Sequence, residues 1–248
     1  MNVLRTSLYG LLALTALVLI TIGVVWNNLP ALPAIESHLQ SNQRGNIYIL
    51  AANGELIEQR GSSNRRRIAP ADMPVHLPAA VLAIEDEHFY RHVGFDPFAI
   101  VRALIANRQA GRIVQGASTI TQQVAKLLYL QPERTWQRKY RELALALSLE
   151  QRYSKDEILG LYLNNVYLGS GNYGVEAASR DYFGKSARDL NLSESAMLAG
   201  LLQAPSRYAP TRDLNKARAR AGVVLDRMLA IGAITPEQAA LAQEHPAQ

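Results

Sequence analysis

Cysteine is absent from the 248-residue sequence, and charged residues are modest in number. Without cysteine, the chain has no disulfide framework, thiol nucleophile, iron–sulfur cluster or cysteine-based zinc site. The 26 basic and 21 acidic side chains leave a formal net charge of +5, and 48% of the residues are hydrophobic. This composition is typical of a folded chain, and the mild positive excess suits a membrane surface or a phosphate-bearing substrate.

A long uncharged run lies near the N-terminus, from Leu8 to Trp26. At a rise of ~1.5 Å per residue, it is long enough to cross a bilayer as one helix. Arg5 before the run favours a cytoplasmic N-terminus and export of the residues after Asn27. The alternative is a cleaved signal peptide, whose apolar region is normally shorter, so we favour an uncleaved anchor.

These patterns divide the sequence into three parts. We expect a cytoplasmic tip and transmembrane anchor in residues 1–27, a juxtamembrane linker in 28–46 and a folded domain in 47–248. The domain begins with a predicted β-hairpin that turns at Asn53. From Pro78 onward, apolar residues recur with helical spacing and no βαβ alternation occurs, so the fold should be mainly α.

The densest group of reactive side chains is AIEDEHFYRHVG, residues 83–94. Glu85 directly follows an apolar helical stretch, where partial loss of hydration would raise its pKa toward that of a general base. The alternative is a solvated helix end that stops at Gly94. His88 and His92 have the spacing of metal ligands, but the zinc-protease pattern needs Glu where Phe89 stands, so we favour structural histidines.

The segment GASTITQQVAK, residues 116–126, predicts the start of a helix. Thr119 and Gln122 have the spacing of a capping box. Thr119, Gln122 and Lys126 would share one face near the helix N-terminus, which is a candidate site for an anion or a sugar. A capped helix without a ligand explains these residues equally well.

The segment RTWQRKYRE, residues 134–142, combines four cations with one acid. Arg138 and Lys139 precede Glu142 by four and three residues, so a local salt-bridge cluster accounts for them. The functional alternative is a cationic clamp for a diphosphate, with Glu142 holding it in place.

The segment GSGNYG, residues 169–174, matches the dinucleotide-binding pattern G-x-G-x-x-G. That motif needs a preceding strand and a parallel sheet, and here it follows a helical run. We therefore interpret these glycines as residues of tight turns and expect no nucleotide or nucleic acid to bind.

Taken in order, these segments resemble the peptidoglycan glycosyltransferases of family 51. The match spans roughly residues 44–230. The first motif, E-D-x-x-F-x-x-H-x-G, fits residues 85–94, and the second, G-x-S-T-x-x-Q-Q, fits 116–123, with Ala117 in place of a commoner glycine. The third, R-K-x-x-E, fits residues 138–142. KDEILGLYLNNVYLG and GLLQAPSRYAP look like the fourth motif and the closing segment.

The resemblance implies a lysozyme-like, two-lobed helical fold whose smaller lobe dips toward the bilayer. It also implies the substrate lipid II, a disaccharide-peptide on undecaprenyl diphosphate. Glu85 would be the base that deprotonates the acceptor 4-hydroxyl, with inversion at the donor anomeric carbon, and Glu142 the second essential carboxylate. The residues implied to bind the substrate are Asp86, Ser118, Thr119, Gln122, Gln123, Lys126, Arg134, Arg138, Lys139 and Tyr167.

The same resemblance implies where the chain acts and with what. A diphosphate leaves as a stable anion, so it needs stabilising positive charge, which the basic side chains can supply, and no proton. No cofactor is required, and a divalent cation (Mg or Mn) could share this role. The expected partners are lipid II, the nascent glycan strand, the bacterial inner membrane and a transpeptidase or other cell-wall protein. The catalytic domain should face the periplasm from a single-pass anchor.

Two alternatives stay open. One is a lysozyme-like muramidase or lytic transglycosylase, although a neutral glycan strand does not require the basic set. The other is a non-catalytic cell-wall scaffold that retains the fold. A transpeptidase domain would need S-x-x-K and K-T-G motifs, and neither occurs in the sequence, so we expect no acylation by penicillin.

Overall fold

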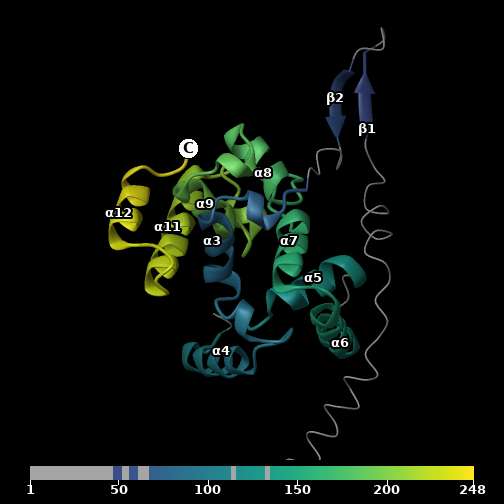
Figure 1. The fold of residues 1–248 in the computed structure, drawn as a ribbon. Helices are drawn as coiled ribbons and strands as arrows, with labels where there is room; N and C mark the ends of the chain where they lie inside the picture. The colour runs from purple at the N-terminus through teal and green to yellow at the C-terminus, as the bar shows by residue number, and fades with distance from the viewer. Residues whose placement is uncertain (1–46, 52–55, 61–66, 113–115, 132–134) are drawn as a thin grey trace, which may run out of the picture.

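The computed structural model describes residues 47–51, 56–60, 67–112, 116–131 and 135–248. Its regular elements are β1 (Ile47–Leu50), β2 (Leu56–Arg60), η1 (Pro70–Asp72), α3 (His76–Glu85), η2 (Phe89–Arg91), α4 (Pro97–Ala110), α5 (Ile120–Tyr129), α6 (Trp136–Arg152), α7 (Lys155–Asn165), α8 (Val175–Phe183), η3 (Ala187–Asp189), α9 (Leu192–Leu201), α10 (Pro205–Tyr208), α11 (Leu214–Ala230) and α12 (Pro236–Glu244). The prediction of a mainly helical fold is confirmed (Figure 1).

Most of the long helices begin where the sequence supplies a side-chain oxygen for a free backbone N–H group. Thr119 and Gln122 form the predicted capping box at the start of α5. Such caps matter because the first N–H groups of a helix have no partner within it. Side-chain caps also start α4, α6, α7, α9, α11 and α12, from Asp96, Thr135, Ser154, Asn191, Asp213 and Thr235, whereas α3 and α8 have no side-chain cap.

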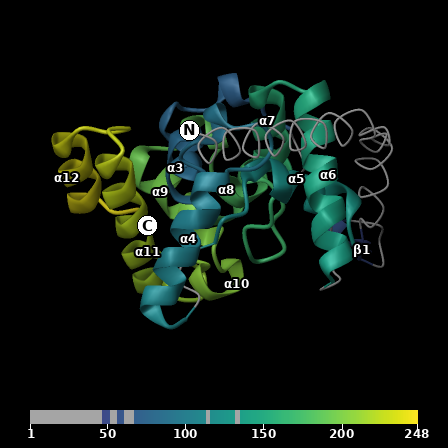
Figure 2. The same ribbon diagram turned by 90° about the horizontal axis from the view of Figure 1, so that it is seen from below.

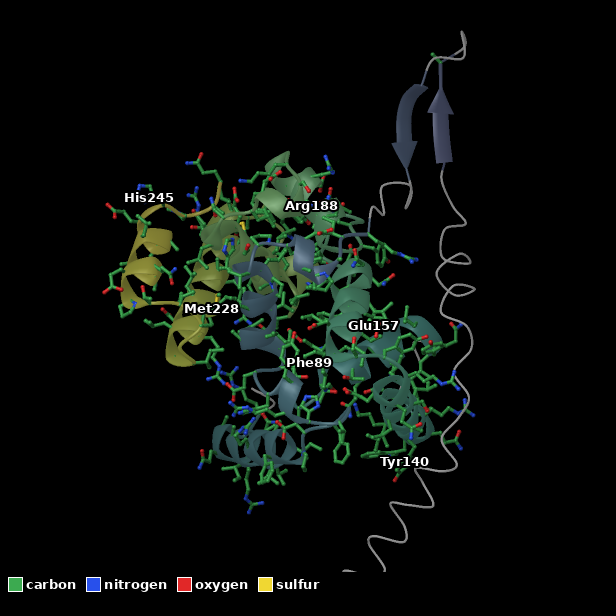
Figure 3. The ribbon with its side chains drawn as sticks, in the orientation of Figure 1. Phe89, Tyr140, Glu157, Arg188, Met228 and His245 are labelled. Atoms are coloured by element: carbon green, nitrogen blue, oxygen red, sulfur yellow. The ribbon has the colours of Figure 1, made fainter. Side chains whose placement is uncertain are left out.

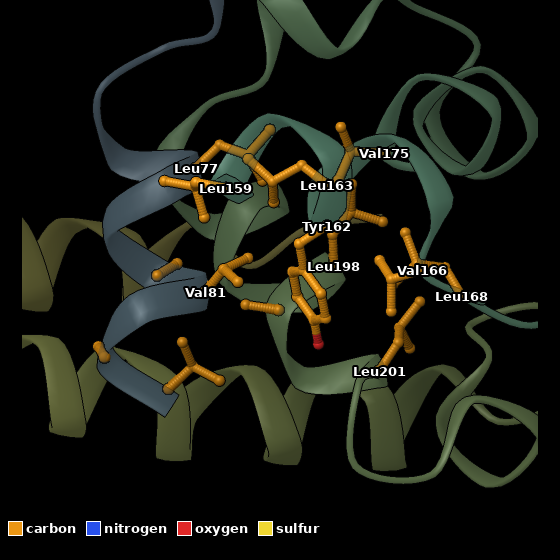
Figure 4. Close-up of a cluster of buried hydrophobic side chains, with 14 of the residues drawn as sticks. Leu77, Val81, Leu159, Tyr162, Leu163, Val166, Leu168, Val175, Leu198 and Leu201 are labelled. Carbon is orange, nitrogen blue, oxygen red and sulfur yellow. The ribbon is translucent and has the colours of Figure 1, made fainter. Parts of the chain in front are cut away.

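Helix α9 lies at the centre of the molecule. Its residues from Ser195 to Leu201 are all buried, as expected for a helix that is apolar on nearly every face. It packs against α3, α11, α8, α10 and α12. Figure 4 shows part of this core, where Leu198 of α9 lies near Tyr162 of α7 and Leu201 of α9 lies near Val166 and Leu168.

Helix α3 packs on this core and carries Glu85 at its C-terminal end. Leu77, Ala80, Val81 and Ala83 are buried, and α3 packs on both α9 and α11. Its last residue, Glu85, is therefore held by the core at the point where the helix ends. Seen from below, α4 lies between α11 and α12 on one side and α5 and α6 on the other (Figure 2).

The loop with the G-x-G-x-x-G pattern contains turns. Gly169, Gly171 and Gly174 all have positive φ, and a Cβ on Gly174 would come within 2.6 Å of the Asn164 carbonyl oxygen. Only glycine fits such a backbone without strain. The loop follows α7 and precedes α8, so the helical context that argued against dinucleotide binding is confirmed.

Strands β1 and β2 pair antiparallel, with Tyr48 opposite Gln59. The turn predicted at Asn53 lies outside the described residues, and so do the anchor and linker predicted in residues 1–46. Within the described ranges, no helix combines the length and the hydropathy needed to cross a membrane.

Candidate active site

A cleft of about 940 Å³ opens beside the C-terminal end of α3. Its walls come from the segment after α3, the first half of α4, the start of α5 and one side of α11. The structure brings five of the predicted site residues to this cleft: Glu85, Asp86, Ser118, Thr119 and Gln123.

Glu85 is held in the cleft by a chain of two hydrogen bonds. Gln123 Nε2 donates to Glu85 Oε2 over 2.7 Å, and the Tyr162 hydroxyl donates to Gln123 Oε1 over 3.2 Å. Tyr162 is 1% exposed, and its ring lies inside the apolar cluster (Figure 4). The core thus fixes the amide of Gln123, and the amide orients the carboxylate of Glu85.

Burial raises the pKa of Glu85 above its usual 4.5. The hydrogen bond from Gln123 and the charges of Arg220 and Lys126 act in the opposite direction, and neighbouring Asp86 adds a further increase. A carboxylate with a raised pKa binds a proton more readily, which is what a general base needs near neutral pH. The partial loss of hydration expected from the sequence is confirmed.

Asp86 joins the segment after α3 to the start of α5. Its Oδ2 accepts from the backbone N–H of Ile120 over 2.9 Å, and His92 Nε2 lies 3.0 Å from Oδ1. Thr119 adds a second link, because its hydroxyl donates to the Gly94 carbonyl over 2.7 Å. The first and second motifs, 34 residues apart, are therefore locked together by buried polar contacts.

Several N–H groups at the start of α5 are already occupied. Asp86 accepts from Ile120, and Thr119 accepts from Gln122. The Gln122 side chain is buried and serves the capping box. In this structure the side chains of Asp86 and Gln122 are used to hold the start of α5 in place. The side chain of Ser118, in contrast, is exposed to solvent in the cleft.

Gly94 ends the first motif at a position where any other residue would be strained. Its φ is +86°, and a Cβ would lie 3.2 Å from both the carbonyl carbon and oxygen of Ala146 in α6. The backbone after the first motif therefore touches α6 directly. This contact brings the helix that carries the third motif close to the first.

The third motif forms a compact ionic group at the start of α6. Glu142 is 4% exposed, accepts from Lys139 Nζ and lies 3.5 Å from Arg138 Nη1. The salt-bridge cluster predicted from the spacing is confirmed. Lys139 Nζ also lies 3.4 Å from Ser118 Oγ, which joins this group to the cleft. Arg138 Nε is buried and has no partner within the described residues.

Three predicted site residues remain, Lys126, Tyr167 and Arg134. Lys126 is exposed on α5, one turn after Gln123. Tyr167 does not line the cleft; its ring packs on Tyr173 with the ring centroids 5.0 Å apart. Arg134 lies outside the described residues.

The two histidines of the first motif have separate partners. His92 contacts Asp86, whereas His88 Nδ1 lies 3.6 Å from Asp96 Oδ2 and 3.3 Å from Arg102 Nη2. Within the part of the chain that the structure describes, no three His, Asp or Glu side chains form a group able to hold a metal ion. The predicted assistance from a divalent cation stays a prediction.

Sequence reasoning missed Tyr162 and the wall of α11. Tyr162 stands inside the segment assigned to the fourth motif, where only packing shows that its hydroxyl reaches Gln123. Arg220 and Arg227 line the cleft together with Gln203. Their separation of seven residues, two helical turns, was the signal that placed both on one face of α11.

A helical fold with a partly buried carboxylate of raised pKa in a polar cleft, near a cluster of cations, has the features of an enzyme active site. The comparisons with known proteins agree. The family model described as transglycosylase matches residues 53–229. The chain belongs to this family, which confirms the resemblance to the family 51 peptidoglycan glycosyltransferases.

Its relatives are larger proteins. The chain is 47% identical over 214 residues to penicillin-binding protein 1A of Aquifex aeolicus and 45% identical over 209 residues to that of Escherichia coli K12. These matches cover 86% and 84% of this chain but 29% and 25% of the relatives. A crystal structure of penicillin-binding protein 1A from Haemophilus influenzae is similar, with 30% identity and a TM-score of 0.51 over 82% of this chain and 21% of that one. The chain thus spans less than a third of the length of these relatives.

Proposed function

We propose that this chain is a peptidoglycan glycosyltransferase that polymerises lipid II into glycan strands. The observation that carries the proposal is the Glu85 carboxylate, partly buried in the cleft, oriented by Gln123 and raised in pKa. Membership of the transglycosylase family and the similarity to penicillin-binding protein 1A support the choice of reaction.

Glu85 acts as the general base on the acceptor. Its carboxylate takes the proton of the 4-hydroxyl of the acceptor GlcNAc, and that oxygen attacks the anomeric carbon of the donor MurNAc. The new C–O bond forms on the face opposite the breaking C–O bond to phosphate, so the α-linkage becomes β. Undecaprenyl diphosphate departs with the bonding electron pair, and Glu85 keeps the proton until solvent removes it.

The leaving group explains why one activated carboxylate is enough. Glycoside hydrolysis needs an acid to protonate an alkoxide, whereas a diphosphate is already a stable anion. Its developing charge needs fixed positive groups. Lys126 and Lys139 supply this charge near the cleft, Arg138 stands beside Lys139, and Arg134 completes the proposed set.

Glu142 organises these cations. Because it is buried and contacts both Lys139 and Arg138, its carboxylate orders both side chains, and Lys139 also reaches Ser118 in the cleft. The cost of ordering two long side chains is then met in the folded protein, before the substrate arrives. Glu142 is essential in this proposal as an orienting group, with no proton transfer assigned to it.

Exposed apolar side chains support an orientation against a bilayer. Phe98 and Leu104 of α4 and Trp136 and Tyr140 of α6 are more than two-thirds exposed. Both helices lie at the lower end of the molecule in Figure 1, and Tyr140 is at that end in Figure 3. Apolar and aromatic groups gathered at one end suit the membrane interface. We propose that this end meets the inner membrane on the periplasmic side, near an anchor in residues 1–27, with a cell-wall transpeptidase as a further partner.

The test is gel analysis of labelled lipid II incubated with the full chain in detergent. We expect the wild type to give a ladder of glycan strands and Glu85→Gln to give none. Glu244→Gln, an exposed acid on α12, is the matched control and should polymerise normally.

Two results would redirect the proposal. A ladder from Glu85→Gln would keep the reaction but assign the base elsewhere. If the folded wild type gives no ladder, the proposal that the chain polymerises lipid II is contradicted. Release of fragments from purified cell wall would then favour the lytic enzyme, and binding of lipid II without turnover would favour the scaffold.

A further inference from the structure

Helix α11 forms a wall of the cleft with two arginines that face the same way. Arg220 and Arg227 are seven residues apart and both line the cleft with Glu85. Arg227 is engaged, because its Nη2 donates to Glu87 Oε2 over 2.6 Å. Arg220 differs: its Nε is buried and has no partner within the described residues.

The Arg220 side chain is nevertheless held in place. A Cβ on Gly200 of α9 would come within 3.0 Å of Arg220 Cγ, so the absence of that side chain makes room for the arginine stem. The guanidinium carbon lies 6.0 Å from the ring centroid of Tyr208, which is within the range of a cation–π contact. Arg220 is half-buried, and a buried guanidinium nitrogen without a hydrogen-bond partner is uncommon and calls for an explanation.

From the place of Arg220 and Glu85 in the same cleft, we propose that Arg220 is a positioning residue of the active site, which acts through Glu85 as a fixed positive charge in the cleft wall. This inference rests on the proposed function of Glu85 as the base. An arginine suits the task because its guanidinium stays charged at every pH at which the enzyme works, so its field on Glu85 is constant.

The charges around Glu85 support this role. Burial raises the pKa of Glu85, and Asp86 raises it further, whereas Arg220 on α11 and Lys126 on α5 lower it. Tyr162 on α7 stays neutral, since burial and the charge of Glu85 raise its pKa well above 10. Without the two cations, the pKa of Glu85 would be raised further.

The other charged groups of the cleft largely neutralise one another. Arg227 pairs with Glu87, and Arg102 lies 3.6 Å from Asp96. Helix α9 packs on α3, but its one charged residue, Glu194, binds Lys185 away from the cleft. The titratable and charged groups that line the cleft are Glu85, Asp86, Glu87, His88, Asp96, Arg102, Arg220 and Arg227.

The test is the pH profile of kcat/KM for lipid II polymerisation by the full chain. The acidic limb reports the pKa of the base in the free enzyme. Because a positive charge favours the carboxylate, Arg220→Met should move this limb to higher pH by about 0.5–1 unit. Arg220→Lys keeps the charge and should leave the limb near the wild-type position.

Arg218→Met is the matched control on the same helix. Its Nε donates to the Ala247 carbonyl, outside the cleft, so this variant loses an α11 arginine without touching Glu85. Its limb should not move. Arg220→Gln is a second neutral variant, and thermal unfolding verifies that each protein is folded.

The inference is overturned if the limb stays in place in folded Arg220→Met and Arg220→Gln, or moves equally in Arg218→Met. Either result, with wild-type polymerisation that still depends on Glu85, leaves the proposed function intact. Failure of the wild type to polymerise would instead contradict the proposed function itself.

Discussion

Gln123 Nε2 lies 2.7 Å from Glu85 Oε2 and donates a hydrogen bond to it. The two residues are 38 positions apart and come from α5 and the end of α3. Since Tyr162 holds the opposite end of the amide, the Glu85 carboxylate is oriented by a buried side chain of a third helix. Preorganisation of this kind saves the reorganisation that a free carboxylate would need during the reaction.

Removing the Tyr162 hydroxyl should slow the reaction. In Tyr162→Phe the amide of Gln123 loses its anchor, so we expect kcat to fall about 3- to 10-fold and the free energy of unfolding to fall by about 1 kcal/mol. Steady-state kinetics and urea unfolding measure the two effects. Tyr182→Phe is the matched control, because its hydroxyl donates to the Leu168 carbonyl outside the cleft. It should lose similar stability and keep kcat; a similar loss of kcat in both would contradict the role of Tyr162.

Glu85→Gln should stabilise the protein in a pH-dependent way. Because the folded-state pKa of Glu85 is raised, the unfolded chain releases this proton at lower pH than the folded chain. The wild type therefore loses stability as the pH rises from 4.5 through the raised pKa, and this loss persists above it. Glutamine cannot ionise, so the Tm advantage of the variant should appear at pH 8 and vanish at pH 4.

Thermal unfolding at both pH values checks this expectation. The exposed Glu244→Gln is the control, and its Tm difference from wild type should not depend on pH in this way. An advantage of Glu85→Gln that is equal at pH 4 and pH 8 would show that Glu85 ionises normally.

Glu142→Gln should abolish polymerisation while leaving the protein folded. Without the carboxylate, Lys139 and Arg138 lose their common partner, and we expect kcat to drop more than about 100-fold, since the transition-state charge is no longer met by oriented cations. The unfolding free energy should fall by about 1 kcal/mol. Glu176→Gln removes another buried acid that pairs with an arginine, in α8. If this control loses activity to the same extent, instability rather than orientation explains Glu142.

Gly94→Ala should be more destabilising than Gly111→Ala. Both glycines have positive φ, +86° and +63°, so alanine is strained at either position. Only at Gly94 does the new Cβ meet the backbone of Ala146; at Gly111 it meets open space. We expect losses of about 1 kcal/mol at Gly111 and about 2–3 kcal/mol at Gly94 from chemical denaturation. Equal losses of unfolding free energy in the two variants would show that the contact of position 94 with α6 does not affect stability.

The local parts of the site follow from the sequence. The capping box of Thr119 and Gln122 and the cluster of Arg138, Lys139 and Glu142 depend on residues three or four apart, and a helix brings such residues together wherever it forms. The ordered motifs also identified the family. Along the chain, however, Asp86 looked like a substrate ligand, and only the structure shows its side chain bound to Ile120 and His92.

Thus the sequence alone determined a helical protein of the transglycosylase family, with Glu85 as its foremost candidate base. Tertiary structure decided what surrounds that base: Gln123 and Tyr162 orient it, and Arg220, 135 residues away, faces the same cleft. The physical reason is the distance along the chain over which each interaction acts. Helical periodicity and capping act over a few residues, whereas the position of α11 beside α3 depends on how both pack against the buried helix α9.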